Sequence, residues 1–432
     1  MLKTAQLHGA PPDEKSERIE PVVVPRPLET LLRPPVALWV GARLASGTAM
    51  TLLRSVFLWQ VYDVSRSTFY LGLVGLLQFL PAPLASLLGG SVADARDRKA
   101  IVLGAQTVAL GCAATLAVLS HLSLVRLLIL FPLVVFAASA TSFESPARQA
   151  TLPMLVPKIE LPGAVTVFVA ANALAFMTGP ALGGVLVAKA SVAAAYGTGA
   201  ALYGVSILLV TCMPPLPRAT TERKRAVDVR AILEGVEFVW KQPALLGSMT
   251  LDMFAVLFGG AAALLPVYAN DILGVGAGGY GLLTSSLEIG GLLTSFVLLA
   301  RRPMRSLGRS LVITVAIYGV ATIVFGLSRS FPLSVAAYVA VGMADQVSVV
   351  IRGTIVQMST PDELRGRVSS VNMLFIGASN QLGAAESGFV AALSTPTFSV
   401  VSGGVVCLFV VLAVAIAIPQ LLRFTTDTTH RA

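Results

Sequence analysis

A few charged residues interrupt long apolar stretches of this chain, and their side chains are the ones most able to do chemistry there. Arg43 and Arg54 share one stretch, and at about 100° per residue both lie on one helical face, together with Met50. Two guanidinium groups on one face can hold an anionic or catechol-bearing molecule in a cavity. Alternatively, Arg43 extends toward the end of its helix and Arg54 pairs with an acid from another helix.

Carboxylates occur in the apolar stretches of the second half of the chain. Glu288 is the deepest, and Asp252 lies about 12 Å into its stretch by the rise of a helix. Burial disfavours the charged form of a carboxyl, so such a group can take up and release a proton near neutral pH. We therefore predict that Glu288 and Asp252 carry protons. A structural role is the alternative for Asp252.

Two further pairs of charged residues stand near the ends of apolar stretches. Glu144 and Arg148 are spaced four apart, so their side chains are neighbours on a helix. Asp345 and Arg352 are seven apart and share one helical face. We expect both pairs to act in gating and conformational change rather than in holding a ligand. A structural ion pair is the alternative for Asp345.

The apolar stretches themselves predict an all-α membrane protein. The chain is 55% apolar and 12% charged, with a mean hydropathy of +0.81, whereas soluble domains carry about 25% charged residues. Stretches of about 20 apolar residues are long enough to span a bilayer. Twelve such helices are expected at 36–62, 68–90, 100–121, 124–147, 161–188, 191–214, 244–270, 279–300, 310–329, 331–353, 368–394 and 398–422.

The distribution of basic residues predicts the orientation of these helices. Most of the 31 Lys and Arg residues fall in the two tails and in alternate connections. The remaining connections hold only Arg66, Arg126, Lys189 and Arg329. Because cytoplasmic loops are enriched in Lys and Arg, both termini are predicted to be cytoplasmic, in a multi-pass protein of a bacterial inner membrane. The net charge of +9 then reflects topology and gives no support to nucleic-acid binding.

Several other classes of site find no support in the sequence. Cys112, Cys212 and Cys407 fall one per span, which suggests neither a disulfide framework nor a metal site. No phosphate-binding Gly-x-x-x-x-Gly-Lys loop, zinc-protease helix or Gly-x-Ser-x-Gly elbow is present. We therefore expect neither an enzyme nor an ATP-driven pump, and no cofactor.

Internal similarity divides the chain into two halves. Three residues after the fourth stretch recur after the tenth at one offset of 204 positions: Arg148, Met154 and Pro157 become Arg352, Met358 and Pro361. This predicts two six-helix bundles, 36–214 and 244–422, flanked by a disordered cytoplasmic N-tail, 1–35, and a cytoplasmic tail, 423–432. The linker 215–243 contains an amphipathic segment from Val229 to Trp240, expected to lie on the inner membrane surface.

The connection between the second and third stretches carries a specific pattern. Gly90, Asp94, Arg98 and Lys99 stand at the positions of the signature loop of the major facilitator superfamily, which this segment resembles. The resemblance implies a loop that helps to hold one face of the bundle closed. This sequence departs from the pattern at Ala95 and Asp97, which puts part of the implied charge network in doubt.

A second pattern lies in the fifth stretch. Gly179, Pro180, Gly183 and Gly184 look like the Gly-Pro-x-x-Gly-Gly element of exporters in this superfamily, although Ala175 replaces an upstream glycine. The resemblance implies a hinge, and an ordinary kinked packing helix is the alternative. The segments Pro146–Pro157 and Thr360–Val368 resemble the corresponding loops of the enterobactin-exporter-like branch, and the likeness extends over about residues 33–423.

These patterns together predict a secondary transporter with twelve helices in two pseudo-symmetric bundles. It would export a small amphipathic molecule, a siderophore or a drug-like compound, in exchange for protons, and would act as a monomer in the lipid bilayer. Two alternatives remain open from the residues alone: an uptake permease for a small metabolite, and a non-transporting membrane receptor on the same scaffold.

Overall fold

The computed structural model describes residues 31, 33–81, 97–157, 159–214, 229–301 and 304–425, and their regular elements are helical. In the described ranges, six helices precede the predicted linker: α1 Pro34–Ser65, α2 Thr68–Phe79, α4 Arg98–His121, α5 Leu127–Leu155, α6 Leu161–Lys189 and α7 Val192–Thr211. The later elements are α8 Val229–Lys241, α9 Pro243–Gly259, η2 Ala261–Leu264, α10 Leu265–Val267, η3 Tyr268–Ile272, α11 Gly276–Ala300, α12 Leu307–Leu327, α13 Phe331–Ser359, α14 Arg365–Leu393, α15 Pro396–Ala417 and α16 Pro419–Leu422.

Local polar residues satisfy the backbone where helices begin. Asp97, Ser191 and Thr395 each accept a hydrogen bond from a first-turn N–H of α4, α7 and α15, at 2.9, 3.0 and 3.1 Å. Within the helices, hydroxyls such as those of Thr141 and Thr284 donate to the carbonyl four residues earlier. Polar side chains can therefore stand in apolar helices without leaving their own groups unpaired.

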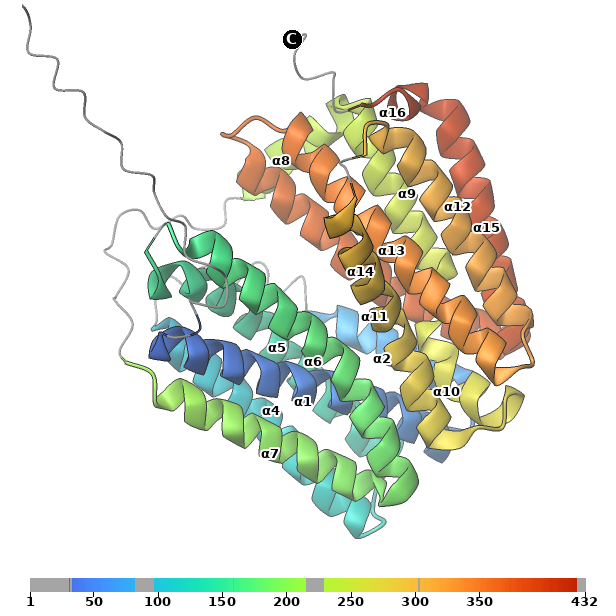
Figure 1. Ribbon diagram of the computed structural model, residues 1–432. Helices are drawn as coiled ribbons and strands as arrows, with labels where there is room; N and C mark the ends of the chain where they lie inside the picture. The colour runs from blue at the N-terminus through green and yellow to red at the C-terminus, as the bar shows by residue number, and fades with distance from the viewer. Residues whose placement is uncertain are drawn as a thin grey trace, which may run out of the picture.

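The helices form two groups (Figure 1). In the first, α1 packs against α6 and α7, and α4 packs against α5 and α7. In the second, α12 packs against α13 and α15, and α11 against α13. The groups meet where α2 contacts α14 and α6 contacts α11, and they diverge toward the ends that carry α8 and the beginning of α1.

Glycines bring the two groups into backbone contact. A Cβ on Gly184 of α6 would lie 2.6 Å from the Cα of Gly281 in α11, and one on Gly388 of α14 would lie 2.3 Å from the nitrogen of Gly72 in α2. Small residues permit such close crossings of membrane helices. Gly184 and Gly388 are separated by the same 204 positions as Arg148 and Arg352, so the two crossings are related by the internal repeat.

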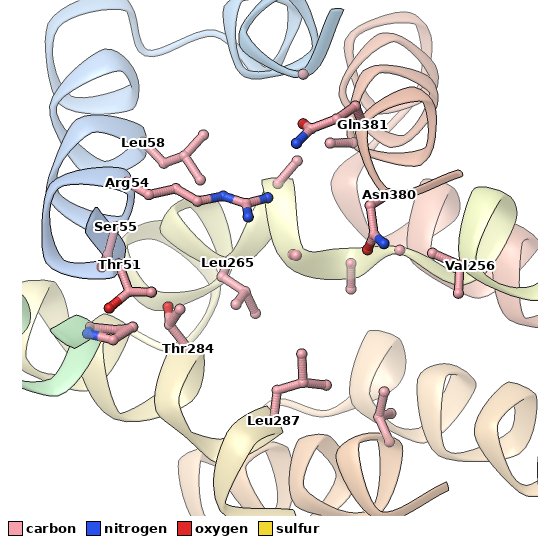
Figure 2. A pocket seen from close by; sticks show the side chains of 18 of the residues that line it. Thr51, Arg54, Ser55, Leu58, Val256, Leu265, Thr284, Leu287, Asn380 and Gln381 are labelled. Carbon is pink, nitrogen blue, oxygen red and sulfur yellow. The ribbon is translucent and has the colours of Figure 1, made fainter. Parts of the chain in front are cut away.

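Ten of the described helices are long and apolar enough to cross a membrane. Of the other two predicted spans, the second is described only as far as residue 81, with α2 covering twelve residues, and α14 is long enough but more polar. The polarity of α14 has a physical reason, because Asn380 and Gln381 point into a cavity between the groups (Figure 2). The seventh predicted span is interrupted at Gly260, after which short helical turns continue to Ile272.

The linker helix α8 packs against the beginning of α14. Glu234 forms an ion pair with Arg367, and a Cβ on Gly235 would lie 3.1 Å from the backbone of Arg367. Lys241 donates to exposed Glu237 at 2.6 Å, and this hydrogen bond and charge lower the pKa of that carboxyl. The location of helix α8 on the membrane surface remains a prediction. The remainder of the linker, the N-tail before residue 31 and the tail after 425 lie outside the described residues.

Candidate functional site

A cavity of about 470 Å³ lies between the two helix groups. Its walls come from α1, α2 and α6 on one side and from α9, η2 and α11–α14 on the other. The lining is largely apolar, with three charged side chains: Arg54, Glu288 and Asp345. Both the size and the mixture of apolar walls with a few polar groups are typical of small-molecule sites.

Arg54 projects from α1 into this cavity. Figure 2 shows its guanidinium extending from the α1 wall toward Asn380 and Gln381 of α14. In the described part of the chain it has neither an ion pair nor a hydrogen bond within the usual limits. A full positive charge is thus held in the cavity without a fixed protein partner, which is costly unless a ligand or water receives it.

Two carboxylates stand on the wall formed by α11 and α13. Glu288 lies within electrostatic range of both Asp345 and Arg54. Neither carboxylate has an ion pair among the residues that the structure describes. The cavity therefore contains one cationic and two acidic side chains, all free to act on a bound molecule.

Of the three residues predicted to form the ligand face of α1, Arg54 lines the cavity. Arg43 stands about 16 Å farther down the helix and donates its Nε–H to Oδ1 of Asn172 in α6 at 2.9 Å. Met50 packs beside Ala109 and Tyr203. Neither Arg43 nor Met50 lines the cavity, because the same helical face meets α6 and the neighbouring core below the cavity.

Asp252 is paired with an arginine of another helix. It forms a buried ion pair with Arg352 of α13 and accepts a hydrogen bond from Ser348 Oγ at 3.3 Å. The exposed fraction is 5% for Asp252 and 4% for Arg352. Arg352 therefore pairs with an acid of α9, while Asp345, predicted to belong with Arg352 in a gate, lines the cavity.

Glu144 and Arg148 form the predicted ion pair within α5. Arg148 Nη2 also donates to Ser46 Oγ at 3.2 Å, and Gln106 Nε2 donates to Glu144 Oε1 at 2.9 Å. The guanidinium carbon of Arg148 lies 5.2 Å from the ring centre of Trp39. This cluster connects α5 to α1 and α4 away from the cavity lining, and its part in gating remains a prediction.

A comparison with known protein families agrees with this architecture. The family model described as "Transmembrane secretion effector" matches residues 33–429, almost the whole chain. The chain belongs to this family. It is thereby a transporter of the major facilitator superfamily and not an enzyme.

The chain is similar to curated exporters along most of its length. It is 27% identical over 389 residues to "Enterobactin exporter EntS" from Citrobacter koseri, covering 89% of this chain and 91% of that protein. It is 25% identical over 365 residues to "Multidrug efflux pump Tap" from Mycolicibacterium fortuitum, covering 82% and 89%. These relatives and the ten apolar helices identify a multi-pass protein of the inner membrane.

Solved transporter structures share the fold of this chain. A bacterial homologue of the human lysosomal transporter Spinster, in an inward-facing and unoccupied conformation, matches with a TM-score of 0.66 and 14% identity, covering 92% of this chain and 97% of that one. The peptide transporter POT in complex with sulfate matches with a TM-score of 0.69 and 13% identity, covering 91% and 96%. At this identity the likeness establishes the fold alone.

The family's signature loop is described only at its end. Gly90 and Asp94 lie outside the described residues. Arg98 donates to the carbonyl oxygen of Ala150 at 2.9 Å, and the Nζ of Lys99 donates to the carbonyl oxygens of Thr211, the last residue of α7, and of Met213 just beyond it. These contacts join the beginning of α4 to the ends of α5 and α7, where a cation also complements the helix dipole.

The glycines of the Gly-Pro element in α6 contact two different neighbouring helices, α1 and α11. A Cβ on Gly179 would lie 2.0 Å from Thr51 Oγ1, and one on Gly183 would lie 3.0 Å from Val56, so both glycines permit contact with α1. Gly184 faces α11 across the two groups. Pro180 lines the cavity while α6 continues through it. The element therefore stands at the junction of the groups, and its role as a hinge remains a prediction.

Sequence reasoning missed the polar contacts that join the groups beyond the cavity. Tyr62 at the end of α1 donates to Asp271 of η3, and Arg66 Nη1 lies 3.9 Å from Asp271 Oδ1. Tyr280 of α11 donates to the carbonyl oxygen of Ser55 at 2.9 Å. The only available signal was the isolation of Arg66 and Asp271 at the ends of apolar stretches. Within the described ranges, no group of His, Cys, Asp and Glu could hold a metal ion.

Proposed function

We propose that this protein exports a small amphipathic molecule in exchange for protons, by alternating access to the cavity between its two helix groups. The observation that carries the proposal is the set of unpaired charges in that cavity: Arg54, Glu288 and Asp345. Intramembrane ionisable groups are costly and are retained mainly where they serve a substrate or ion pathway. A cavity at the junction of two repeated groups fits the plan of secondary transporters.

Contacts at one end support a state with access from the other end. Gly184 meets Gly281, Gly72 meets Gly388, and Tyr62 meets Asp271. These contacts lie at the end of the molecule opposite to α8, which packs against the beginning of α14. With cytoplasmic termini, as the basic residues predict, the diverging end in Figure 1 faces the cytoplasm, where an exporter collects its cargo.

Glu288 and Asp345 are the proposed proton carriers. The sequence favoured Glu288 and Asp252, but Asp252 already has a buried counter-charge in Arg352. Releasing that carboxylate for protonation would leave Arg352 buried and unpaired. Asp345 has no such partner in the described chain and shares the cavity with Glu288, so protonation there does not break an ion pair.

The proposed direction and coupling can be tested in inverted membrane vesicles that contain the full-length protein. Acidifying the vesicle interior should drive the fluorescent dye ethidium inward, and the addition of an uncoupler should abolish the accumulation. Glu288→Gln and Asp345→Asn should remove accumulation driven by the pH gradient, whereas exchange of dye for dye should persist at dye concentrations high enough to saturate the variants. Accumulation that is insensitive to the gradient, or movement of dye only outward from inverted vesicles, would overturn the proposal.

A further inference from the structure

We infer that the cavity wall formed by α11 and α13 binds a protonated amine of the cargo, while Arg54 and α14 bind an acceptor group of the same molecule. This inference rests on the proposed function and names its substrate class. The cargo is then an amine-bearing or zwitterionic amphiphile. A polyanionic catecholate, which Arg43 and Arg54 together suggested, is disfavoured.

The balance of charge in the cavity is the first argument. Arg54 contributes one positive charge, whereas Glu288 and Asp345 contribute two negative charges when ionised. Arg43, which would have balanced them, is held by Asn172 outside the cavity lining. A molecule with several anionic groups would place at least one of them near the acidic wall, where repulsion is weakly screened.

Tyr338 supplies an independent observation at the acidic wall. It is 4% exposed, lines the cavity, and its ring lies on α13 two turns before Asp345. The hydroxyls of Tyr280 and Tyr318 donate to the carbonyls of Ser55 and Gly259 at 2.9 and 3.3 Å. The hydroxyl of Tyr338 has no hydrogen-bond partner among the described residues, although electrostatically it is close to Glu288 and Asp345.

Tyr338 lines the cavity, and its hydroxyl, which has no partner in the described chain, is therefore open to a ligand. Since a hydroxyl oxygen accepts hydrogen bonds, Tyr338 can receive an N–H from an ammonium group that lies between Glu288 and Asp345. The aromatic rings of Tyr338 and Tyr318 add a surface that attracts cations.

The opposite side of the cavity has the complementary chemistry. Figure 2 shows Arg54 directed toward Gln381 and Asn380, which are neutral amides. A guanidinium and two amides can donate to a carboxylate, a carbonyl or a hydroxyl of the cargo. The two sides thus differ in sign, as a zwitterion or a polar amine requires.

Two fluorescent probes that differ only in the charged end can test the inference with the purified full-length protein in detergent. Dansylcadaverine ends in an ammonium group, and N-dansyl-6-aminohexanoate ends in a carboxylate. We expect dansylcadaverine to bind at least about tenfold more tightly at neutral pH. Exchanging both acids, Glu288→Gln with Asp345→Asn, should weaken it about tenfold or more, and Tyr338→Phe about threefold, as for one hydrogen bond.

The control is Glu386→Gln, the same chemical change on a half-buried acid of α14 that does not line the cavity. It should leave the preference for dansylcadaverine unchanged. Tighter binding of the carboxylate probe, or an unchanged preference in the double variant when it elutes as a folded monodisperse protein, would overturn the inference. Since binding is measured without a pH gradient, selective binding without gradient-driven transport would refute only the proposed function.

Discussion

Two buried arginines, one in each helix group, show how the repeat has diverged. Arg148 and Arg352 are separated by 204 positions, and both are nearly inaccessible, at 3% and 4% exposure. Each forms an ion pair with an acid, and a serine is hydrogen-bonded to one member of that pair. Around Arg148 the acid is Glu144 on the same helix and the serine is Ser46 on α1. We call these three residues the first cluster.

The second cluster, Arg352 with Asp252 and Ser348, has the reverse arrangement. Its acid stands on α9 and its serine on the same helix as the arginine. Ser348 follows Glu144 by 204 positions, and Asp252 follows Ser46 by 206. The acid and the hydroxyl have therefore exchanged helices while the arginine has kept its place.

This exchange changes what holds the helices together. In the first cluster the ion pair lies within α5, and a hydrogen bond from Arg148 to Ser46 connects it to α1. In the second cluster the ion pair itself connects α13 to α9. Separating α9 from α13 would leave two buried charges unpaired, which is far more costly than losing one hydrogen bond to a serine. We therefore expect α1 to move more readily against α5 than α9 against α13.

The largest effect is expected when the carboxylate between α9 and α13 is removed. Asp252→Ser leaves Arg352 buried without a counter-charge, and we expect it to destabilise the folded protein by about 3–5 kcal/mol. The thermal unfolding midpoint of the purified protein in detergent measures this loss.

Asp252→Ser combined with Ser348→Glu rebuilds the arrangement of the first cluster in the second. It should recover most of the lost stability, because the new carboxylate stands four residues before Arg352. If the double variant unfolds at the same temperature as the single one, the two arrangements are not interchangeable and the comparison fails.

A smaller effect, on rate, is expected from the reciprocal exchange in the first cluster. Ser46→Asp with Glu144→Ser places the ion pair between α1 and α5. If movement of α1 is part of the transport cycle, dye transport should slow about tenfold, equivalent to about 1.4 kcal/mol in the barrier. Initial rates of ethidium accumulation in inverted vesicles measure this change.

The matched control for this exchange is the variant Asp252→Ser with Ser348→Glu, which releases α9 from α13. It should transport at least as fast as the unaltered protein once expression is equalised. An unchanged rate in the Ser46→Asp, Glu144→Ser variant would show that α1 and α5 need not separate during transport.

The sequence was sufficient for the architecture, and it singled out two residues that line the cavity, Arg54 and Glu288. Apolar length predicted the membrane helices, and the recurrence of Arg148 as Arg352 predicted two related halves. Arg54 and Glu288 were recognisable as charges within apolar stretches, and their roles in binding and proton transfer remain predictions. These predictions depend on local periodicity and spacing, which a single sequence displays directly.

The partners of the buried charges could not be predicted in the same way. Asp345 and Arg352 share a helical face, but two turns separate them by about 10.5 Å along the axis, so the arginine reaches a neighbouring helix. Which acid it meets there depends on how α9 packs against α13. The exchange of acid and serine also hides the repeat at these positions, because the matched residues differ in type.

The smallest expected effect compares the two serines. Ser46→Ala removes a hydrogen bond that joins α1 to Arg148, whose Nε and Nη1 already have no partner in the described chain, and should cost about 1 kcal/mol. Ser348→Ala should cost less, because the ion pair of Asp252 with Arg352 still joins α9 to α13 and the lost hydrogen bond is long, at 3.3 Å. Unfolding midpoints of both variants, measured side by side, give the order. A larger loss for Ser348→Ala would mean that the hydroxyl, rather than the ion pair, governs the contact between α9 and α13.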